Sequence, residues 1–308
     1  MLRTIIIFER HWDTRPKQLI TNVLPQLKAS GYNLLCLEAP HDLSPAVLHD
    51  RVIKSAEDST QVHEKVISLL KKRHVMVNGA LSDMGYQALK SLVYQYISTR
   101  NTTDVVELLL NYPAQLAMKT MMEQAQILAM PVMGIDIDSA RMEKLLAINL
   151  ESRITALDIV AAERNQSMVG HLQTLQRENK GVVFLCGVDH AEEVMVLVRQ
   201  YNLQDYVSCY FVHSERRFDD SIDDIAIYSN TDTLREKSIL LTNDGEVKDF
   251  SDKLLKEMRQ ANQHCLPERV NKPKSLAGRL FKSLQERLMP TNTMEVPSSS
   301  ENKVKSKI

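Results

Sequence analysis

Short runs of consecutive apolar residues, rich in β-branched side chains, alternate along the chain with segments of helical periodicity. Unbroken apolar runs of this kind predict strands that are covered on both faces of a sheet. The predicted strands are Thr4–Phe8, Asn33–Glu38, Pro131–Asp136, Gly181–Cys186 and Val207–Val212, with weaker candidates at Ile225–Tyr228 and Ile239–Leu241. This alternation predicts an α/β fold, with a central, mostly parallel or mixed sheet and flanking helices.

Segments with helical spacing fill the gaps between these strands. A helix over Pro16–Ser30 should end at Gly31, because glycine tolerates the left-handed conformation that follows many helices. The other predicted helices are Gln61–Lys72, Asp83–Ser98, Thr103–Leu110, Ala114–Ala129, one or two helices over Ser139–Glu178, Ala191–Tyr201 and Asp249–Gln263. The block over residues 60–129 contains no predicted strand, so we expect a helical insertion within one domain over residues 1–265.

Composition and charge narrow the classes of function. The 308 residues carry 38 Lys and Arg against 39 Asp and Glu, so no general attraction to nucleic acid is expected. No apolar run approaches the ~20 residues of a transmembrane helix, and no signal peptide is visible, which predicts a cytoplasmic protein. Cys36, Cys186 and Cys209 lie inside apolar runs and are predicted to be small buried side chains.

The C-terminal segment, residues 271–308, differs from the rest of the chain because it contains eight basic residues and only three acidic ones. Apolar residues recur in it at helical spacing, at Leu276, Leu280, Phe281, Leu284 and Leu288. This pattern predicts a short amphipathic helix that packs on its own domain or contacts a partner or an anionic membrane. After Pro290 the chain is polar and predicted to be disordered. A secretion address for an effector delivered into another cell is a further hypothesis for this end.

Acidic and histidine side chains follow four of the predicted strands. Because the carboxyl ends of parallel strands lie at one edge of a sheet, we expect these side chains to converge. The first strand leads into Glu9 and His11, whose spacing on an extended chain places them on the same face. The other strands lead into Glu38 and His41, Asp136 and Asp138, and Asp189 and His190.

Imidazoles and carboxylates at one edge of a sheet can perform two kinds of chemistry. They can bind a divalent metal such as Mn, Zn, Co or Fe and activate its water, with His11, Glu38 and His190 as candidate ligands and His213 in reserve. Alternatively, a Glu–His pair can act as a metal-free base that deprotonates water or an alcohol. Haem is not expected, because the chain has no CxxCH motif.

Several short motifs carry a family resemblance. They are Phe8-Glu9-Arg10-His11, Leu37-Glu38, Arg164-Asn165-Gln166-Ser167-Met168 and Gly187-Val188-Asp189-His190. In this order, over residues 4–200, they resemble the superfamily of erythromycin esterases, ChaN-like haem-binding proteins and TraB/Tiki proteins. The resemblance implies a site made of Glu9, His11, Glu38 and His190, with Arg164 supporting it or binding an anionic group. Two positions depart from the family pattern, since Phe8 replaces a glycine and Asn165 stands where an aspartate is common.

Two classes of function are compatible with these residues. The first is a hydrolase-like enzyme acting on an ester or peptide, in which His11 or His190 activates water and Glu9 and Glu38 hold it. The alternative is a non-enzymatic module that binds a metal, haem or a metabolite, or that contacts a protein through a degenerate site. Phe8 favours the alternative, because a β-carbon at this position would hinder close approach of a ligand to the backbone.

Overall fold

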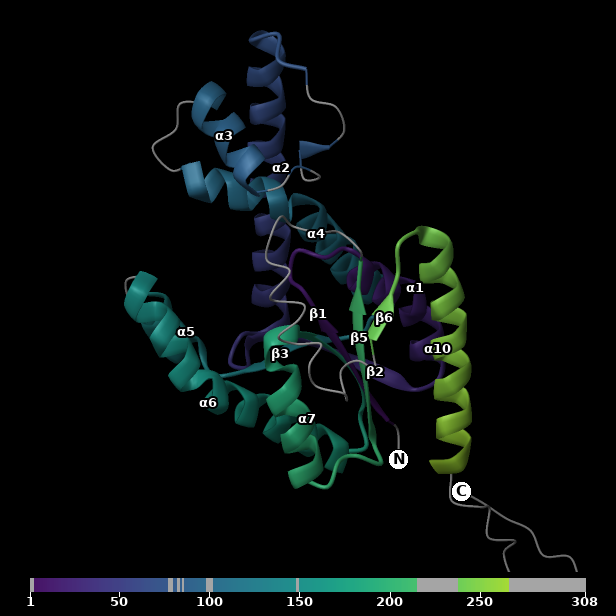
Figure 1. Ribbon diagram of the computed structural model, residues 1–308. Helices are drawn as coiled ribbons and strands as arrows, with labels where there is room; N and C mark the ends of the chain where they lie inside the picture. Colours follow the sequence, from purple (N-terminus) through teal and green to yellow (C-terminus); the bar gives the residue numbers. More distant parts are fainter. Residues whose placement is uncertain are drawn as a thin grey trace, which may run out of the picture. The chain divides into compact units, whose positions relative to one another are not determined.

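The described strands of the computed structural model form one six-stranded sheet, in which all neighbouring strands run parallel (Figure 1). The strands are β1 (Thr4–Glu9), β2 (Tyr32–Pro40), β3 (Val132–Asp136), β4 (Gly181–Gly187), β5 (Val207–His213) and β6 (Ser238–Leu240). Their order across the sheet is β3-β2-β4-β1-β5-β6. The predicted α/β class with a central parallel sheet is therefore confirmed.

The structure describes most of the chain up to residue 265. The described residues are 3–76, 80–81, 84, 86–97, 102–147, 150–214 and 238–265. They belong to one compact unit, residues 1–265. The predicted strand Ile225–Tyr228 and the basic segment 271–308 lie outside the described residues, so both stay predictions.

Helices connect the strands and cover both faces of the sheet. They are α1 (Arg15–Ala29), α2 (Pro45–Lys72), α3 (Tyr86–Ile97), α4 (Thr102–Ile127), α5 (Ser139–Leu146), α6 (Leu150–Arg177), α7 (Ala191–Gln200) and α10 (Asp244–Cys265), with a 3-10 turn, η2 (Val188–His190), before α7. Gly31 has a φ of 95°, which agrees with its predicted place just beyond the end of α1. None of the helices in the described part of the chain is long and apolar enough to cross a membrane.

Alternate residues of β1 pack into two separate apolar cores, one on each face of the sheet. Ile5 and Ile7 pack with residues of α1, α4 and α10, whereas Ile6 and Phe8 pack with residues of α6 and α7. The Phe8 side chain is therefore buried in a core and does not stand exposed at the end of the strand. Phe8 therefore gives no reason to expect that a ligand is obstructed at the end of β1.

The three cysteines of the apolar runs are buried, as predicted. Cys36, Cys186 and Cys209 lie inside the sheet and form no disulfide. Burial raises the pKa of the Cys36 and Cys186 thiols well above the ordinary range. These thiols therefore stay protonated, and a nucleophilic role does not suit them.

The helical block is longer and more continuous than the sequence predicts. α2 begins at Pro45, where the side chain of Ser44 accepts a hydrogen bond from the amide of Val47. α4 runs on through Pro113, where the prediction placed a break between two helices. Proline disfavours a helix interior, but α4 packs along both α1 and α2, and this tertiary packing outweighs the missing backbone hydrogen bond.

Gly134 in β3 marks a close approach between two strands. The pairing of β2 with β3 shifts register between Leu37 and Pro40, opposite this glycine. A β-carbon on Gly134 would lie 2.2 Å from the carbonyl oxygen of Pro40 and 2.3 Å from that of Ala39. Both neighbours are backbone atoms, so the position requires glycine if β2 and β3 are to keep this spacing.

We expect Gly134→Ala to lower the free energy of unfolding by about 2–3 kcal/mol, because the new methyl group forces the two strands apart. Gly170→Ala in α6 is the control. A β-carbon there meets nothing within 4 Å, and alanine should stabilise the helix by about 0.5–1 kcal/mol. Urea unfolding followed by circular dichroism measures both effects. If Gly134→Ala and Gly170→Ala changed the free energy of unfolding equally, the close approach of β2 and β3 at Gly134 would be contradicted.

Candidate functional site

The carboxyl ends of three adjacent strands bring the predicted site residues together. Glu9 ends β1, Glu38 lies near the end of β2, and His190 follows β4. Since β4 lies between β2 and β1 in the sheet, these three ends are neighbours. His11 follows β1 by two residues, and α6 contributes Arg164 from the face of the sheet that it covers.

The Glu38 carboxylate binds three neighbours. Its Oε1 accepts hydrogen bonds from Arg164 Nη2 at 2.5 Å and from His190 Nε2 at 3.0 Å, and its Oε2 accepts one from the Gly187 amide at 2.7 Å. Burial alone would raise the pKa of Glu38. The hydrogen bond from His190 and the charges of His190, His11 and Arg164 outweigh burial and hold that pKa well below its usual range. Glu38 is therefore ionised at neutral pH.

Arg164 joins Glu38 to a second buried carboxylate, Asp136. The Arg164 Nε and Nη2 donate to Asp136 Oδ2 at 2.9 and 2.6 Å, and the other oxygen of Asp136 accepts from the amide of Ile137 at 2.7 Å. Burial lowers the pKa of Arg164, but the hydrogen bonds and charges of Asp136 and Glu38 more than compensate and raise it. Arg164 is thus a largely buried cation fixed between two carboxylates, which differs from a surface salt bridge.

Both ring nitrogens of His190 face acceptors. Nδ1 lies 2.7 Å from Asn165 Oδ1, and Nε2 faces Glu38. The amide nitrogen of Asn165 donates to Glu193 Oε2 at 2.6 Å, which orients the amide so that its oxygen faces His190. His190 is therefore held between Asn165 and Glu38, and its Nε2 contact helps to fix the Glu38 carboxylate.

His11 is the exposed member of this cluster, with 66% of its side chain accessible. It lies in a turn after β1, closed by a hydrogen bond from the Asp13 amide to the Arg10 carbonyl. The ring Nδ1 lies 3.5 Å from Glu9 Oε1 and the ring Nε2 lies 3.8 Å from Glu38 Oε2. The interaction with Glu9 raises the pKa of His11, desolvation opposes this rise, and the charge of Glu38 adds to it. Solvent screens these charges because the ring is exposed.

Lys17 is the residue of this cluster that the sequence analysis missed. It lies in the first turn of α1, is 1% exposed, and donates to Glu9 Oε2 at 2.5 Å. The signal that could have revealed it is helical spacing. Lys17 falls on the stripe of buried residues that continues with Ile20, Leu24 and Leu27. A lysine on the apolar face of a helix needs a buried partner, and Glu9 is that partner.

Other predicted residues have structural contacts outside the Glu38 network. His41 Nδ1 lies 2.7 Å from the Asp136 carbonyl oxygen, and its ring packs on that of His171. Asp138 accepts a hydrogen bond from the Arg141 amide at the start of α5, and His213 stacks on Phe211. These contacts are typical of helix caps and packed rings.

The donor atoms do not suit a divalent metal. Within the described ranges, no group of three or more His, Cys, Asp or Glu side chains is arranged to hold a metal ion. Of the three predicted ligands, His11, Glu38 and His190, the last two already use their ring nitrogens and carboxylate oxygens in hydrogen bonds. The Arg164 cation also lies against Glu38, where it would repel a metal ion. The geometry therefore fits the metal-free interpretation better.

No protein-family model matches the chain, and no curated protein matches it. Among solved structures, the type III effector HopBA1 is similar with a TM-score of 0.31 and 16% sequence identity, over 61% of this chain and 67% of that chain. This likeness is too distant to assign a family. The erythromycin esterase resemblance remains a prediction that rests on the sequence motifs.

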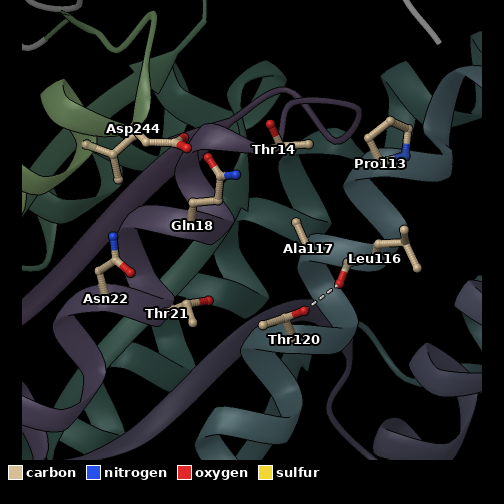
Figure 2. Close-up of a pocket in the computed structure, with 10 residues that line it drawn as sticks. Thr14, Gln18, Thr21, Asn22, Pro113, Leu116, Ala117, Thr120 and Asp244 are labelled. Atoms are coloured by element: carbon tan, nitrogen blue, oxygen red, sulfur yellow. Dashed lines mark hydrogen bonds between the residues drawn. The ribbon is translucent and has the colours of Figure 1, made fainter. Parts of the chain in front are cut away.

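A pocket of about 710 Å³ lies beside α1 (Figure 2), and its lining does not include Glu38. It is lined by Thr14, Gln18, Thr21 and Asn22 at α1, by Pro113, Leu116, Ala117 and Thr120 of α4, and by Asp244 and Val247 of α10. Thr14 joins the His11 turn to α1, so one end of the pocket is three residues from His11 along the chain. The lining combines hydroxyl and amide groups with an apolar wall, and it carries one charged residue, Asp244.

Glu38 should make the stability of the protein sensitive to acid. Its folded-state pKa lies below the ordinary value of 4.5, so its stabilising contribution is complete above that value and declines as pH falls below it. We expect the free energy of unfolding to fall between about pH 5 and pH 3.5 more steeply in the wild type than in Glu38→Gln. Urea unfolding at each pH measures this difference. Glu57→Gln on the exposed face of α2 is the control and should follow the wild type; parallel curves for wild type and Glu38→Gln would contradict the assignment.

Proposed function

We propose that the chain is a hydrolase that cleaves an ester or peptide bond, with His11 as general base and without a metal. The observation that carries this proposal is the position of His11. Its exposed ring lies between two carboxylates, with Glu9 at one nitrogen and Glu38 at the other. A histidine flanked in this way can exchange a proton with solvent-borne groups near neutral pH.

The two ring nitrogens have different roles in this proposal. Glu9 faces Nδ1, which favours the tautomer with its proton on Nδ1 and a lone pair on Nε2. The 3.8 Å between Nε2 and Glu38 Oε2 allows one water molecule to contact both atoms from the side at ordinary hydrogen-bond distances. Such a water would be oriented by Glu38 and deprotonated by His11.

The reaction follows from this placement. His11 Nε2 takes a proton from the water as its oxygen bonds to the substrate carbonyl carbon, and the carbonyl electrons move to the carbonyl oxygen. When the tetrahedral intermediate collapses, the bond to the leaving oxygen or nitrogen breaks and His11 returns the proton to it. Glu9 stabilises the imidazolium that exists between these two steps.

The remaining residues hold Glu38 in place. Arg164 and His190 both donate to Oε1, which keeps the carboxylate ionised and directs Oε2 toward His11. Gly187 allows Glu38 and His11 to approach each other, because a β-carbon there would lie 2.8 Å from Glu38 Oε2 and 3.0 Å from His11 Nε2. These residues position the reacting groups and do not themselves transfer the proton.

Replacing His11 tests the proposal directly. We expect His11→Asn to lower kcat/KM about 10²–10⁴-fold on an activated ester such as p-nitrophenyl acetate or butyrate, or on a fluorogenic peptide panel, because the general base is lost. The exposed side chain can be replaced without loss of folding, which circular dichroism checks. The control is His74→Asn, at an exposed residue with a φ of 56° that asparagine tolerates.

Two results would separate the alternatives. Hydrolysis that is unchanged in His11→Asn would contradict a role for this residue in catalysis. Absence of hydrolysis on every ester and peptide by the folded wild type would favour the non-enzymatic, ligand-binding alternative.

The pH dependence offers a second test. Because His11 must be unprotonated to act as base, kcat/KM should rise with pH through a midpoint above 6.5, the ordinary value for histidine. The interaction with Glu9 is the largest contribution to the raised pKa, so Glu9→Gln should move the midpoint to lower pH. A pH–rate profile on the same ester measures both. A midpoint that moves upward in Glu9→Gln would contradict the assigned contact.

A further inference from the structure

Lys17 holds the turn that carries His11 at three points. Its ammonium group donates to Glu9 Oε2 at 2.5 Å, to the carbonyl oxygen of His11 at 3.0 Å and to that of Asp13 at 2.9 Å. A lysine ammonium has three N–H donors and no acceptor. All three donors are therefore engaged, and each acceptor belongs to the end of β1 or to the turn that follows it.

Burying this cation is energetically costly. Lys17 and Glu9 are each 1% exposed, and the transfer of two charges from water into a protein interior is repaid only by close pairing and full hydrogen bonding. An apolar residue at this position would join the buried face of α1, next to Ile20, without that cost. The cation is thus poorly explained by stability alone, which points to a role in the arrangement of its neighbours.

The two oxygens of Glu9 have separate partners. Oε2 accepts from Lys17, and Oε1 faces His11 Nδ1 at 3.5 Å. Because Lys17 fixes one oxygen, the rotation of the carboxylate is fixed and its other oxygen is directed at the imidazole. The same ammonium holds the backbone of His11 itself, so the ring and its carboxylate partner are located by one group.

The far end of the turn is also anchored. The Asp13 carboxylate accepts from the Arg15 amide at 3.0 Å and from the Ser214 amide, beyond the end of β5, at 2.7 Å. The Asp13 backbone carbonyl is one of the Lys17 acceptors. The turn is thereby tied to α1 and to the chain after β5, in addition to the bonds that Lys17 makes to its backbone.

We propose that Lys17 is a positioning residue, which orients Glu9 toward His11 and fixes the turn that presents the His11 ring to solvent. The inference rests on the proposed function only for its effect on turnover. The effect of Lys17 on the geometry and protonation of His11 can be measured even if the protein has no hydrolase activity.

Charges from three elements face His11. They are Glu9 of β1 and Glu38 of β2, which favour the imidazolium, and Lys17 of α1, which disfavours it. Removal of Lys17 takes away the opposing charge and leaves Glu9 without its cation. A purely structural role for Lys17 predicts lower stability with no change in how strongly Glu9 acts on the titration of His11.

The test compares Lys17→Met with the wild type by NMR titration of the His11 imidazole. The His11 signal is identified as the one that disappears in the spectrum of His11→Asn. Because Lys17 holds Glu9 against His11, we expect Glu9→Gln to shift the His11 titration midpoint less in the Lys17→Met background than in the wild type. If the wild type hydrolyses p-nitrophenyl esters, kcat of Lys17→Met should fall about 100-fold with a smaller change in KM. The control is Lys119→Met, at a partly exposed Lys119–Glu123 pair in α4 with a 4.0 Å separation, which should change neither quantity.

If Glu9→Gln shifts the His11 midpoint equally in the wild type and in folded Lys17→Met, the proposal is overturned. If Lys17→Met does not fold, the neutral pair Lys17→Met/Glu9→Gln removes both buried charges and allows the comparison. In that variant kcat should be lower than in Glu9→Gln alone, because the turn that carries His11 loses its anchor. Equal turnover in Glu9→Gln and in the double variant would overturn the inference. An inactive wild type, in contrast, would contradict the proposed hydrolase and leave the NMR comparison as the test of Lys17.

Discussion

The pairing of buried carboxylates with buried cations is the constraint on which this end of the molecule depends. Glu9, Glu38 and Asp136 all stand at or near the ends of parallel strands, with little or no exposure to water. Uncompensated charges there would be expensive, and they would repel one another. Lys17 neutralises the first, and Arg164 lies between the other two. The helices that supply these cations, α1 and α6, cover opposite faces of the sheet.

This arrangement leaves one ring exposed between two fixed carboxylates. His190 and Arg164 hold Glu38 on one side, and Lys17 holds Glu9 on the other, so neither carboxylate needs the His11 proton for its own stability. His11 is therefore the member of the network whose charge can change without leaving a buried charge unpaired. That separation between paired buried ions and one exposed ring is the physical basis on which we propose acid–base chemistry at this edge of the sheet.

The hydrophobic pattern alone predicted the strands and the meeting of polar residues at their carboxyl ends. It predicted the limits of the helices less well. The apolar runs predicted strands β1 to β5 to within about two residues at each end, and the acidic or histidine residues after them did reach one edge. The helix prediction divided α4 into two helices at residues 111–113 and missed the first turns of α2. Propensity and periodicity do not register the packing of α4 against α1 and α2.

The sequence by itself determined the α/β class, the buried cysteines and the candidate set of carboxylates and histidines, because these depend on hydrophobic periodicity and on where strands end. The tertiary structure decided which of them meet. Lys17 reaches Glu9, Arg164 reaches Glu38 across 126 residues of chain, and Asn165 orients His190. The reason is that the energy of a charge depends on its burial and on partners far away in the sequence, and both are settled only when helices pack on the sheet.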